Sequence, residues 1–390
     1  MKRKTSSIFF AFFIALSSFG QIDQTLLIIG RNTGTHTFHD GESTRIFGFT
    51  SSLSAPTKIP GPTIICNSGD SVRLNFLNLS QGAPHTIHLH GMDVDQQNDG
   101  VPEYSFEVMH DETMPYFFKA PHPGTYLYHC HVGSAVHLQA GMYGLVIVRP
   151  SDGSSTMNWD NGETYDREFS LLASEIDTVW HNDTILDHEH MPGMQLYVPT
   201  VFKPQYFLIN GRSGNQLSDP NGHLYALANE KIYMRLANIG YYGSRFIFPS
   251  ALNARTVASD GRPLPVEYSS NIIEVLPGER YETFIQLGTT DLTPFVVEHF
   301  NLNTGQTESS QTMYFNLSSA SIEEDEHLTL YPNPTNDFVH IGVNNEGFCV
   351  TNTDGQLVCC GQGTLVDLSP YAKGIYFIQT GGSVYRVVKH

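Results

Sequence analysis

The sequence is poor in cysteine, in basic residues and in long apolar runs, and each shortage excludes a class of protein. Five cysteines in 390 residues are too few for a scaffold held together by disulfides. The 21 Lys and Arg are outnumbered by 39 Asp and Glu, so the formal charge is −18 and a nucleic-acid partner is not expected. No segment approaches the roughly 18 apolar residues that a membrane-spanning helix needs. No long stretch shows helical periodicity either.

The N-terminus has the pattern of a secretory signal peptide. The charged residues Lys2, Arg3 and Lys4 precede a short apolar run over residues 8–16, and small residues follow up to Gly20. We therefore expect residues 1–20 to be a signal peptide and the mature protein to be soluble and exported.

The remaining sequence predicts an all-β protein of several domains. Short runs rich in Val, Ile, Tyr, Phe and Thr alternate with Gly, Pro, Asn and Asp, as in β-sandwiches with Greek-key connections. Polar stretches after Pro150 and around residues 318–326 resemble linkers. We expect domains over residues 21–150, 151–320 and 321–390.

The first of these domains contains a set of residues that copper prefers. Cys130 lies between two histidines, His85 precedes it on another strand, and His137 and Met142 follow it closely. A thiolate, two imidazoles and a weak axial thioether are the ligands of a blue, electron-transferring copper. A single methionine such as Met142 is more often a core residue, but the four residues together predict a copper site. We expect His137 and Met142 on the loop and strand start that follow the cysteine strand.

A second set of histidines flanks the same cysteine. In an extended strand His88 and His90 point to one face, because side chains alternate with a period of two. His129 and His131 also share a face, opposite to that of Cys130. These two pairs predict a cage of four imidazoles, joined to the Cys130 sulfur by a short covalent path through the backbone.

The sequence around these residues, over roughly residues 25–150, resembles the multicopper oxidases (laccases and their relatives). The matching segments are Pro60-Gly61-Pro62-Thr63, Gly69-Asp70, His88-Leu89-His90-Gly91, Asp99-Gly100-Val101-Pro102, Gly124-Thr125-Tyr126-Leu127-Tyr128-His129-Cys130-His131 and Gly141-Met142-Tyr143-Gly144. The resemblance implies that a type 1 copper is held by His85, Cys130, His137 and Met142. It also implies a type 2 copper at His88, a type 3 pair at His90, His129 and His131, and a proton-delivering carboxylate at Asp99.

The pattern departs from that of three-domain laccases, whose first domain carries a serine where Cys130 stands. One domain here carries both ligand sets, as in two-domain multicopper oxidases and, more distantly, in copper nitrite reductases. Nitrite reductases lack the histidine that follows the cysteine, so His131 favours an oxidase. Residues 151–320 resemble the copper-free middle domain of laccases, through Phe207-Leu208-Ile209-Asn210-Gly211-Arg212, Arg235-Leu236-Ala237-Asn238, Ser259-Asp260-Gly261-Arg262-Pro263 and Pro277-Gly278-Glu279-Arg280-Tyr281. The implied fold is a tandem of cupredoxin-like Greek-key β-sandwiches plus a small C-terminal β-sandwich.

The source of a complete second copper site stays open. A trinuclear cluster takes eight histidines from two domains in this family, and the second domain offers only His181, His188, His190, His223 and His299. The pair His188 and His190 lies in an acidic, loop-like run that we expect to be solvated surface. Either a homo-oligomer completes the cluster across an interface, or the second site is smaller than in laccases.

The C-terminal residues resemble a secretion signal of another kind. The segments Tyr331-Pro332-Asn333-Pro334 and Gly374-Ile375-Tyr376-Phe377 are similar to the C-terminal sorting domain of type IX secretion cargo. The resemblance implies the type IX secretion machinery as a partner and a secreted or cell-surface location. One disulfide is compatible with the tail cysteines Cys349, Cys359 and Cys360, and its pairing stays open.

These observations predict a secreted multicopper oxidase. It would pass single electrons from a small-molecule or metal-ion donor at the type 1 copper to dioxygen at a type 2/type 3 site. Two other functions stay open: a nitrite reductase-like enzyme, and a copper-binding electron carrier without turnover. His88, His90 and His131 favour the oxidase over a carrier, which needs only the four type 1 ligands. The sequence does not select among phenols, cuprous ion, ferrous ion and manganese as donor.

Overall fold

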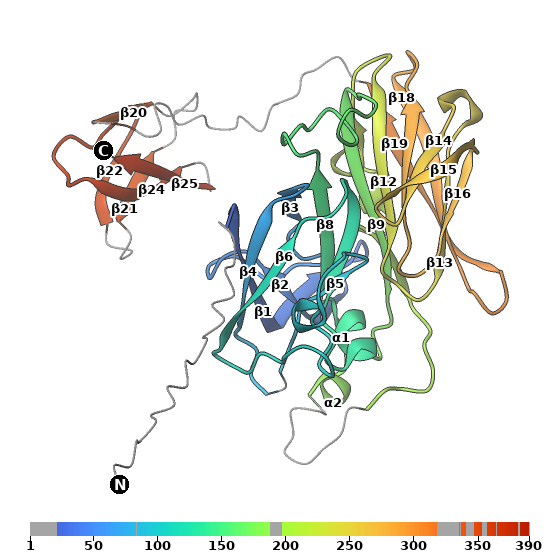
Figure 1. Ribbon diagram of the computed structural model, residues 1–390, viewed down its shortest axis with the longest axis horizontal. Helices are drawn as coiled ribbons and strands as arrows, with labels where there is room; N and C mark the ends of the chain where they lie inside the picture. The colour runs from blue at the N-terminus through green and yellow to red at the C-terminus, as the bar shows by residue number, and fades with distance from the viewer. Residues whose placement is uncertain are drawn as a thin grey trace, which may run out of the picture. The chain divides into compact units, whose positions relative to one another are not determined.

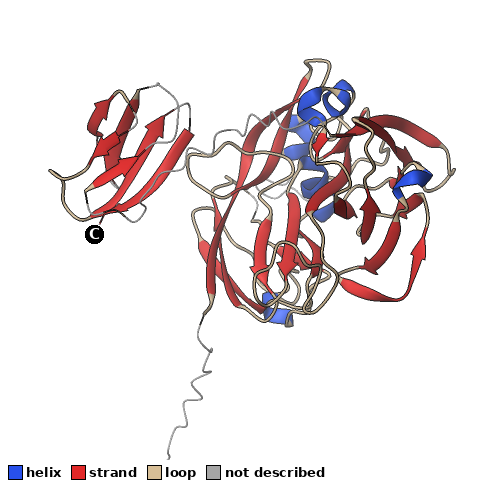
Figure 2. Ribbon diagram, turned by 90° about the horizontal axis from the view of Figure 1, so that it is seen from above, coloured by secondary structure: helices blue, strands red, loops and turns tan. Residues whose placement is uncertain are grey.

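The computed structural model describes residues 22–82, 84–187, 197–317, 335, 337–340, 347–352, 357–363, 365–380 and 383–389. The chain divides into two compact units, residues 1–317 and 318–390. The predicted signal peptide and the pair His188 and His190 lie outside the described residues. Strands dominate and helices are short, which confirms the all-β prediction (Figure 1; Figure 2). Within the described ranges, no helix combines the length and the apolar character required to cross a membrane.

The first half of the larger unit, here called the first domain, is a sandwich of two four-stranded sheets (Figure 1). Their strand orders are β2-β1-β4-β6 and β3-β8-β7-β5. The elements are β1 Gln24–Thr37, β2 Ser43–Thr50, β3 Ile64–Asn67, β4 Ser71–Asn78, β5 His88–His90, η1 Gln96–Asn98, β6 Thr113–Lys119, β7 Gly124–His129, α1 Ser134–Ala140 and β8 Tyr143–Arg149. Strand β1 pairs in parallel with β4, and β3 with β8, so neighbours in space are often distant in sequence.

The core of the first domain comes from alternating side chains on these strands. Strand β4 buries Val72, Leu74 and Phe76 and leaves the residues between them more exposed. Cys66 lies in the same core, and burial raises the pKa of its thiol to about 12. The inner faces of the two sheets therefore enclose a dry interior, within which Cys130 is also buried.

The sheet that carries β7 is buried on both faces. Every residue of β7 is buried, and so is every residue of β8 except Arg149. Tyr126 and Tyr128 pack into the core of the first domain, whereas Leu127 and Leu145 pack against Leu172 and other residues of the second half of the unit. The outer face of this sheet is thus an interface between the two sandwiches.

The second half of the larger unit, here called the second domain, is a larger sandwich. Its sheets have the orders β10-β9-β12-β17-β14-β15 and β11-β19-β18-β13-β16. The strands are β9 Arg167–Ile176, β10 Tyr206–Ile209, β11 Leu224–Tyr225, β12 Lys231–Asn238, β13 Gly243–Ile247, β14 Arg255–Ser259, β15 Arg262–Ser269, β16 Ile272–Val275, β17 Arg280–Gln286, β18 Leu292–Phe300 and β19 Thr307–Asn316. The short helices are α2 Asp183–Leu186, α3 Asn215–Ser218, η3 Pro220–Gly222 and η4 Ser250–Leu252.

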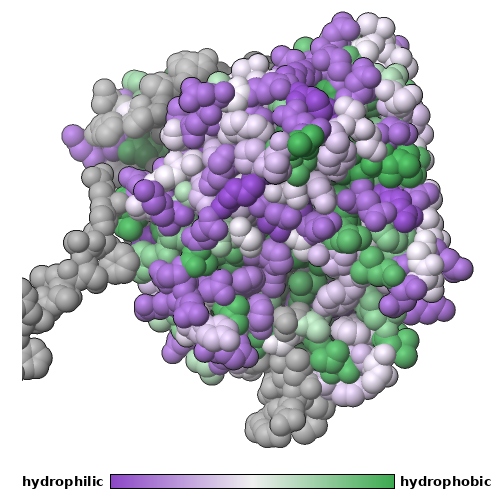
Figure 3. All heavy atoms as spheres, turned by 45° about the vertical axis from the view of Figure 1, so that its right-hand side comes forward, coloured by the Kyte–Doolittle hydropathy of each residue, from purple (hydrophilic) through white to green (hydrophobic). Residues whose placement is uncertain are grey.

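On the face drawn in Figure 3, hydrophobic side chains are dispersed among hydrophilic ones.

Buried charges reinforce the interface between the two domains. The side chain of Arg235 on β12 is fully buried, and its Nη2 lies 3.0 Å from Oε2 of Glu168. Its Nη1 donates a hydrogen bond of 3.1 Å to the hydroxyl of Thr125 on β7. Arg149 of the first domain also pairs with Glu168. Because each of these buried charges has a partner of opposite sign, breaking one pair would leave an uncompensated charge in the interface.

The smaller unit is an independent set of strands with its own core. Strand β20 Phe338–His340 pairs with β23 Leu365–Asp367. The other sheet has the order β22-β21-β24-β25, with β21 Phe348–Asn352, β22 Leu357–Gly361, β24 Gly374–Thr380 and β25 Ser383–Lys389. A disulfide joins Cys349 to Cys360 across the β21–β22 ladder, and Cys359 is free. The pairing that the sequence left open is therefore Cys349–Cys360.

Candidate metal centres

Two groups of side chains in the first domain can each hold a metal ion. In both, the ligand atoms all lie within 4.8 Å of one another. The first group consists of His85, Cys130 and His137, and the second of His88, His90 and His129.

The first group lies in the core of the first domain. The Cys130 sulfur is 3.6 Å from Nδ1 of His85 and 3.4 Å from Nδ1 of His137. All three residues are fully buried. The Phe47 ring packs against both imidazoles, with centroid distances of 6.2 Å to His85 and 5.6 Å to His137. The result is a sulfur with two imidazoles in a dry pocket, which is the donor set of a type 1 copper.

The chain segment after Cys130 brings His137 and Met142 back to the sulfur. The backbone N–H of Cys130 donates to the carbonyl of Met142 over 3.0 Å, and the N–H of Met142 donates to the carbonyl of His137 over 3.0 Å. Met142 is fully buried in the same core cluster. His137 lies on α1, a short helix, and not on a loop as the sequence suggested. Glycine with positive φ flanks this helix at both ends, Gly133 at 50° and Gly141 at 116°.

The second group lies on the opposite face of the sheet, at the interface with the second domain. Strands β5 and β7 are antiparallel, with His88 directly opposite His129. Because side chains alternate along each strand, His88, His90 and His129 point to the same side. The ring centroids are 5.1 Å apart for His88 and His129, and 5.5 Å apart for His90 and His129.

Carbonyl groups orient all three of these rings. Nδ1 of His88 lies 2.7 Å from the carbonyl oxygen of Asp99, and Nδ1 of His129 lies 3.0 Å from that of Cys130. The ring of His90 bonds to the backbone of Gly278 in the second domain. Each bond occupies the outer nitrogen and leaves the inner nitrogen of the same ring for a metal ion, which is how metal-binding histidines are commonly held.

Burial keeps these histidines neutral. It lowers the pKa of His129 to about 3 and that of His90 to about 4, and it also lowers the pKa of His88. The Arg280 guanidinium is the second cause of the shift at His90. Neutral imidazoles are the form that binds metal, so the donor set fits a copper ion at neutral pH.

His131 and Asp99 lie at the edge of this group. The His131 ring centroid is 5.3 Å from that of His88 and 6.0 Å from that of His129, and His131 does not belong to the group of three ligand atoms. Strand β7 ends at His129, so the alternation of the strand does not extend to His131. One carboxylate oxygen of Asp99 lies 3.4 Å from Nδ1 of His88.

The sequence did not show which residues of the second domain face the histidine cage. In the structure an arginine, Arg280, lies there. Arg280 is almost fully buried and donates to the carbonyl of Thr125 over 3.3 Å. Its guanidinium lies against Gly91, where a Cβ atom would come within 2.2 Å of Nη2. Sequence reasoning noted Arg280 only as part of a turn motif. Nothing in the sequence indicates that Arg280 contacts Gly91, because the two residues are far apart in the chain.

The described histidines of the second domain serve other purposes. Both ring nitrogens of His181 contact backbone carbonyls, and His223 lies 2.9 Å from the carbonyl of Ser218. His299 is fully buried against Phe207, with ring centroids 5.1 Å apart. None of these three is in either group of metal ligands found among the described residues.

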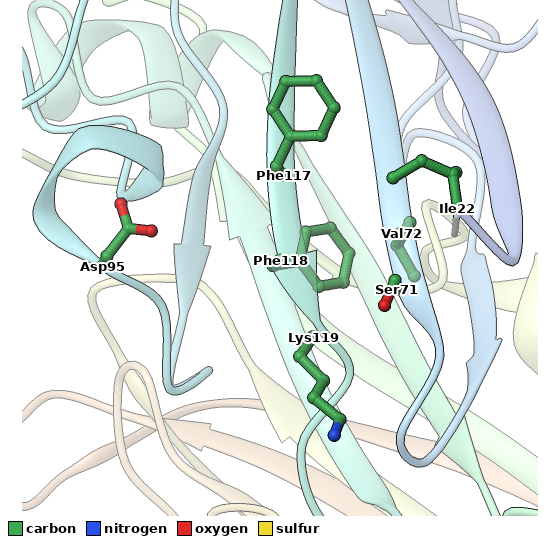
Figure 4. A pocket seen from close by; sticks show the side chains of 7 residues that line it. All are labelled: Ile22, Ser71, Val72, Asp95, Phe117, Phe118 and Lys119. Carbon is green, nitrogen blue, oxygen red and sulfur yellow. The ribbon is translucent and has the colours of Figure 1, made fainter. Parts of the chain in front are cut away.

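A surface hollow near the edge of the first domain stands apart from both groups. It has a volume of about 210 Å³ and lies over β4 and β6 (Figure 4). Its lining residues are Ile22, Ser71, Val72, Asp95, Phe117, Phe118 and Lys119. None of these residues is a member of the two groups of ligands, so the hollow is not part of the metal centres.

Comparison with known families agrees with this geometry. The family model described as multicopper oxidase matches residues 33–153. The model described as secretion system C-terminal sorting domain matches residues 329–390.

Several characterised proteins are similar in sequence. An L-ascorbate oxidase of Cucurbita pepo var. melopepo is 28% identical over 264 residues, which cover 61% of this chain and 44% of that protein. A copper-containing nitrite reductase of Neisseria gonorrhoeae is 27% identical over 184 residues, covering 47% of this chain and 42% of that protein. The chain thus spans less than half the length of these curated relatives.

Solved structures share the fold. The blue copper oxidase from Nitrosomonas europaea superposes with a TM-score of 0.58 at 23% identity, covering 75% of this chain and 85% of that chain. A copper nitrite reductase from the same organism superposes with a TM-score of 0.57 at 19% identity, covering 76% of this chain and 94% of that chain. At these identities the likeness concerns the fold. Together with the cysteine–histidine group, the comparisons show that the chain carries a copper-binding domain of the multicopper oxidase family and a C-terminal secretion sorting domain.

Proposed function

We propose that this protein is a secreted multicopper oxidase whose first domain holds both the electron-accepting copper and the oxygen-reducing copper site. The observation that carries the proposal is the position of Cys130 and His129, adjacent in sequence, in the two groups of ligands. One group lies inside the sandwich and the other on its outer face. A bonded path of one peptide unit therefore joins the two centres.

In this proposal His85, Cys130, His137 and Met142 hold a type 1 copper. His88 holds a type 2 copper, and His90, His129 and His131 contribute to a type 3 pair. Copper bound at these residues would supply one-electron transfer from a donor and the four-electron, four-proton reduction of dioxygen to two waters. The chain holds the ligands, excludes water from the buried sulfur and connects the two sites.

Asp99 has a role of its own in the proposal. Its carbonyl fixes the ring of His88, and its partly exposed carboxylate lies beside the same ring. A carboxylate between solvent and the cage can carry protons to the site of oxygen reduction. The change Asp99→Asn should therefore lower turnover and alter its pH profile while copper content stays the same. A variant with an unaltered pH profile would exclude this role.

We further propose that the active species is a homo-oligomer. The described part of the chain gathers four imidazoles at the cage, three in the compact group and that of His131 at its edge, and the second domain places Arg280 there and not a histidine. A neighbouring chain that shares the cage would supply further ligands, as symmetric association readily allows. If two chains share one cluster, metal analysis combined with native mass should give five coppers per dimer. A monomer with a smaller second site would give about two coppers per chain.

A nitrite reductase-like function is the second candidate. It is favoured by the compact group of three histidines, which suits a single copper ion, and by the nitrite reductase relative. Oxygen uptake with a phenolic or metal-ion donor would support the oxidase. Formation of nitric oxide from nitrite, without oxygen uptake, would replace it with the reductase.

The C-terminal residues are the basis for the proposed export of the protein. Residues 329–390 match the sorting domain, and neither group of ligands includes a residue of this unit. We propose that the tail directs the protein to the type IX secretion machinery and has no part in catalysis.

A further inference from the structure

Helix α1, which carries His137, is held in place by the second domain. Gln139 is 3% exposed and joins the helix to the end of β9 at two points. Its Nε2 donates to the carbonyl of Glu175 over 3.0 Å, and its Oε1 accepts from the backbone N–H of Asp177 over 2.8 Å. Both polar atoms of a single side chain, two residues from a proposed copper ligand, are thus fixed by the same segment of the second domain.

Two further side chains of the second domain bond to the backbone of the helix. Nε2 of His181 lies 3.0 Å from the carbonyl oxygen of Gln139, while its Nδ1 lies 2.6 Å from the carbonyl oxygen of Arg45 on β2. The hydroxyl of Tyr241 donates to the carbonyl of Ala135 over 2.6 Å, near the start of the helix. Tyr241 is itself held, because its backbone N–H donates to the carboxyl of Glu175. We call Glu175, Asp177, His181 and Tyr241 the anchoring residues.

The helix has little stability of its own. It is seven residues long, and isolated helices shorter than about 12 residues are marginal in water. The glycines at its two ends, Gly133 and Gly141, leave the backbone free to adopt other conformations. Its position therefore depends on the groups that pack against it and bond to it, and the anchoring residues supply hydrogen bonds from outside the first domain.

We propose that Gln139 and the anchoring residues are positioning residues for the copper ligand His137. Under this proposal the second domain controls the type 1 centre without supplying a ligand to it. It keeps the His137 imidazole at a fixed distance from the Cys130 sulfur, through contacts that reach the helix from 36 to 106 residues away in the chain. The proposal rests on the type 1 assignment made above.

If the anchoring residues position His137, their loss should change the properties of the bound copper as well as the stability of the protein. Reduction of a type 1 copper depends on the geometry and surroundings of its ligands. Loosening α1 should change the reduction potential and the visible and electron paramagnetic resonance spectra, even where the protein remains folded and fully loaded.

The test compares copper-loaded variants of the full chain. Gln139→Leu keeps a similar volume and removes both side-chain hydrogen bonds, and Tyr241→Phe removes one bond to the same helix. We expect the equilibrium constant for one-electron reduction to change about tenfold in Gln139→Leu, equivalent to about 59 mV, and less in Tyr241→Phe. His181→Gln, which can still donate one hydrogen bond, should lie nearer to the parent than His181→Leu.

Asp183→Asn is the matched control. Asp183 lies close in sequence to His181 and pairs with Arg45 over 2.9 Å, but it makes no described bond to α1. This variant should keep the parent potential and spectra. If Gln139→Leu does not fold, the milder Tyr241→Phe and the two His181 variants decide the question.

Failure of this proposal can be told apart from failure of the proposed function. Parent potentials and spectra in folded Gln139→Leu and Tyr241→Phe, with a blue parent protein, would overturn the positioning role alone. A copper-loaded parent that lacks the blue band would refute the type 1 assignment, and the positioning role with it.

Discussion

Replacement of Gly91 by alanine should strongly destabilise the contact between the histidine cage and the second domain. Gly91 follows His90 with φ of +80°, and a Cβ there would lie 2.2 Å from Nη2 and 3.0 Å from Cζ of Arg280. The positive φ alone costs an alanine roughly 1–2 kcal/mol. Displacing the buried guanidinium would weaken its hydrogen bonds to carbonyl and carboxylate groups, at about 1.5–3 kcal/mol for a bond to a charged group. The total expected loss is about 2.5–5 kcal/mol.

Gly41 provides the control for the backbone effect. Its φ is +88°, and nothing lies within 4 Å of the place where its Cβ would be. Gly41→Ala should therefore show only the conformational cost of about 1–2 kcal/mol. Urea unfolding of the copper-free protein, followed by fluorescence and circular dichroism, gives the difference between the two variants.

The clash can also be removed by shortening the side chain of Arg280. In an Arg280→Ala background, the change Gly91→Ala should cost no more than Gly41→Ala does, because the guanidinium is gone. Equal destabilisation by Gly91→Ala and Gly41→Ala in the parent background would refute the reasoning. It would mean that Arg280 does not lie against the residue that follows His90.

Other predictions concern the copper, the tail and the response to acid. The copper-loaded protein should be intensely blue and Cys130→Ser colourless in the visible spectrum, whereas a persistent band in that variant would place the thiolate elsewhere. Met142→Leu should stay blue with a raised potential in a redox titration, because a weaker axial donor destabilises the oxidised copper; a lowered potential would contradict the axial role. A chain that ends at residue 318, made in another host, should keep copper and activity but lose export in the native cell, and loss of the blue band there would make the tail part of the functional fold. Burial lowers the pKa of His299 to about 3 from 6.5, so the unfolded state binds more protons between these values and stability falls as pH drops below about 6.5. At pH 5 this residue should cost about 2 kcal/mol relative to neutral pH, so urea unfolding of His299→Leu should show a weaker decline with acid, and an equal decline in the two proteins would contradict this assignment.

Three of the four proposed type 1 ligands could be predicted from sequence because they are close together in the chain. Cys130, His137 and Met142 lie within 13 residues, and their types alone suggest copper. The alternation of β5 and β7 likewise predicted that His88, His90 and His129 share a face. The same rule predicted His131 beside them; β7 ends at His129, and the His131 ring lies at the edge of the group, with its centroid 5.3 Å from that of His88.

What sequence could not provide are contacts between distant positions. Short helices such as α1 have no clear periodic pattern, so His137 was expected on a loop. The roles of Arg280, His181 and Tyr241 depend on how two sandwiches dock, and docking is set by the shapes of whole sheets. Nothing in the residues around Gln139 indicates that its amide bonds twice to the backbone at the end of β9, more than 30 residues away.

The burial of β7 and β8 on both faces means that the copper-binding domain is not a transferable module. A cut after residue 150 would expose Leu127 and Leu145 to water and strip Arg149 of its carboxylate partner. Such a fragment should aggregate even though it retains every predicted copper ligand. Engineers who wish to graft the blue site onto another protein, or to exchange it for that of a relative, would have to move both sandwiches together. For the same reason, a substitution at the interface in the second domain should be poorly tolerated unless the first domain changes with it, so the two halves are expected to have diversified as a pair.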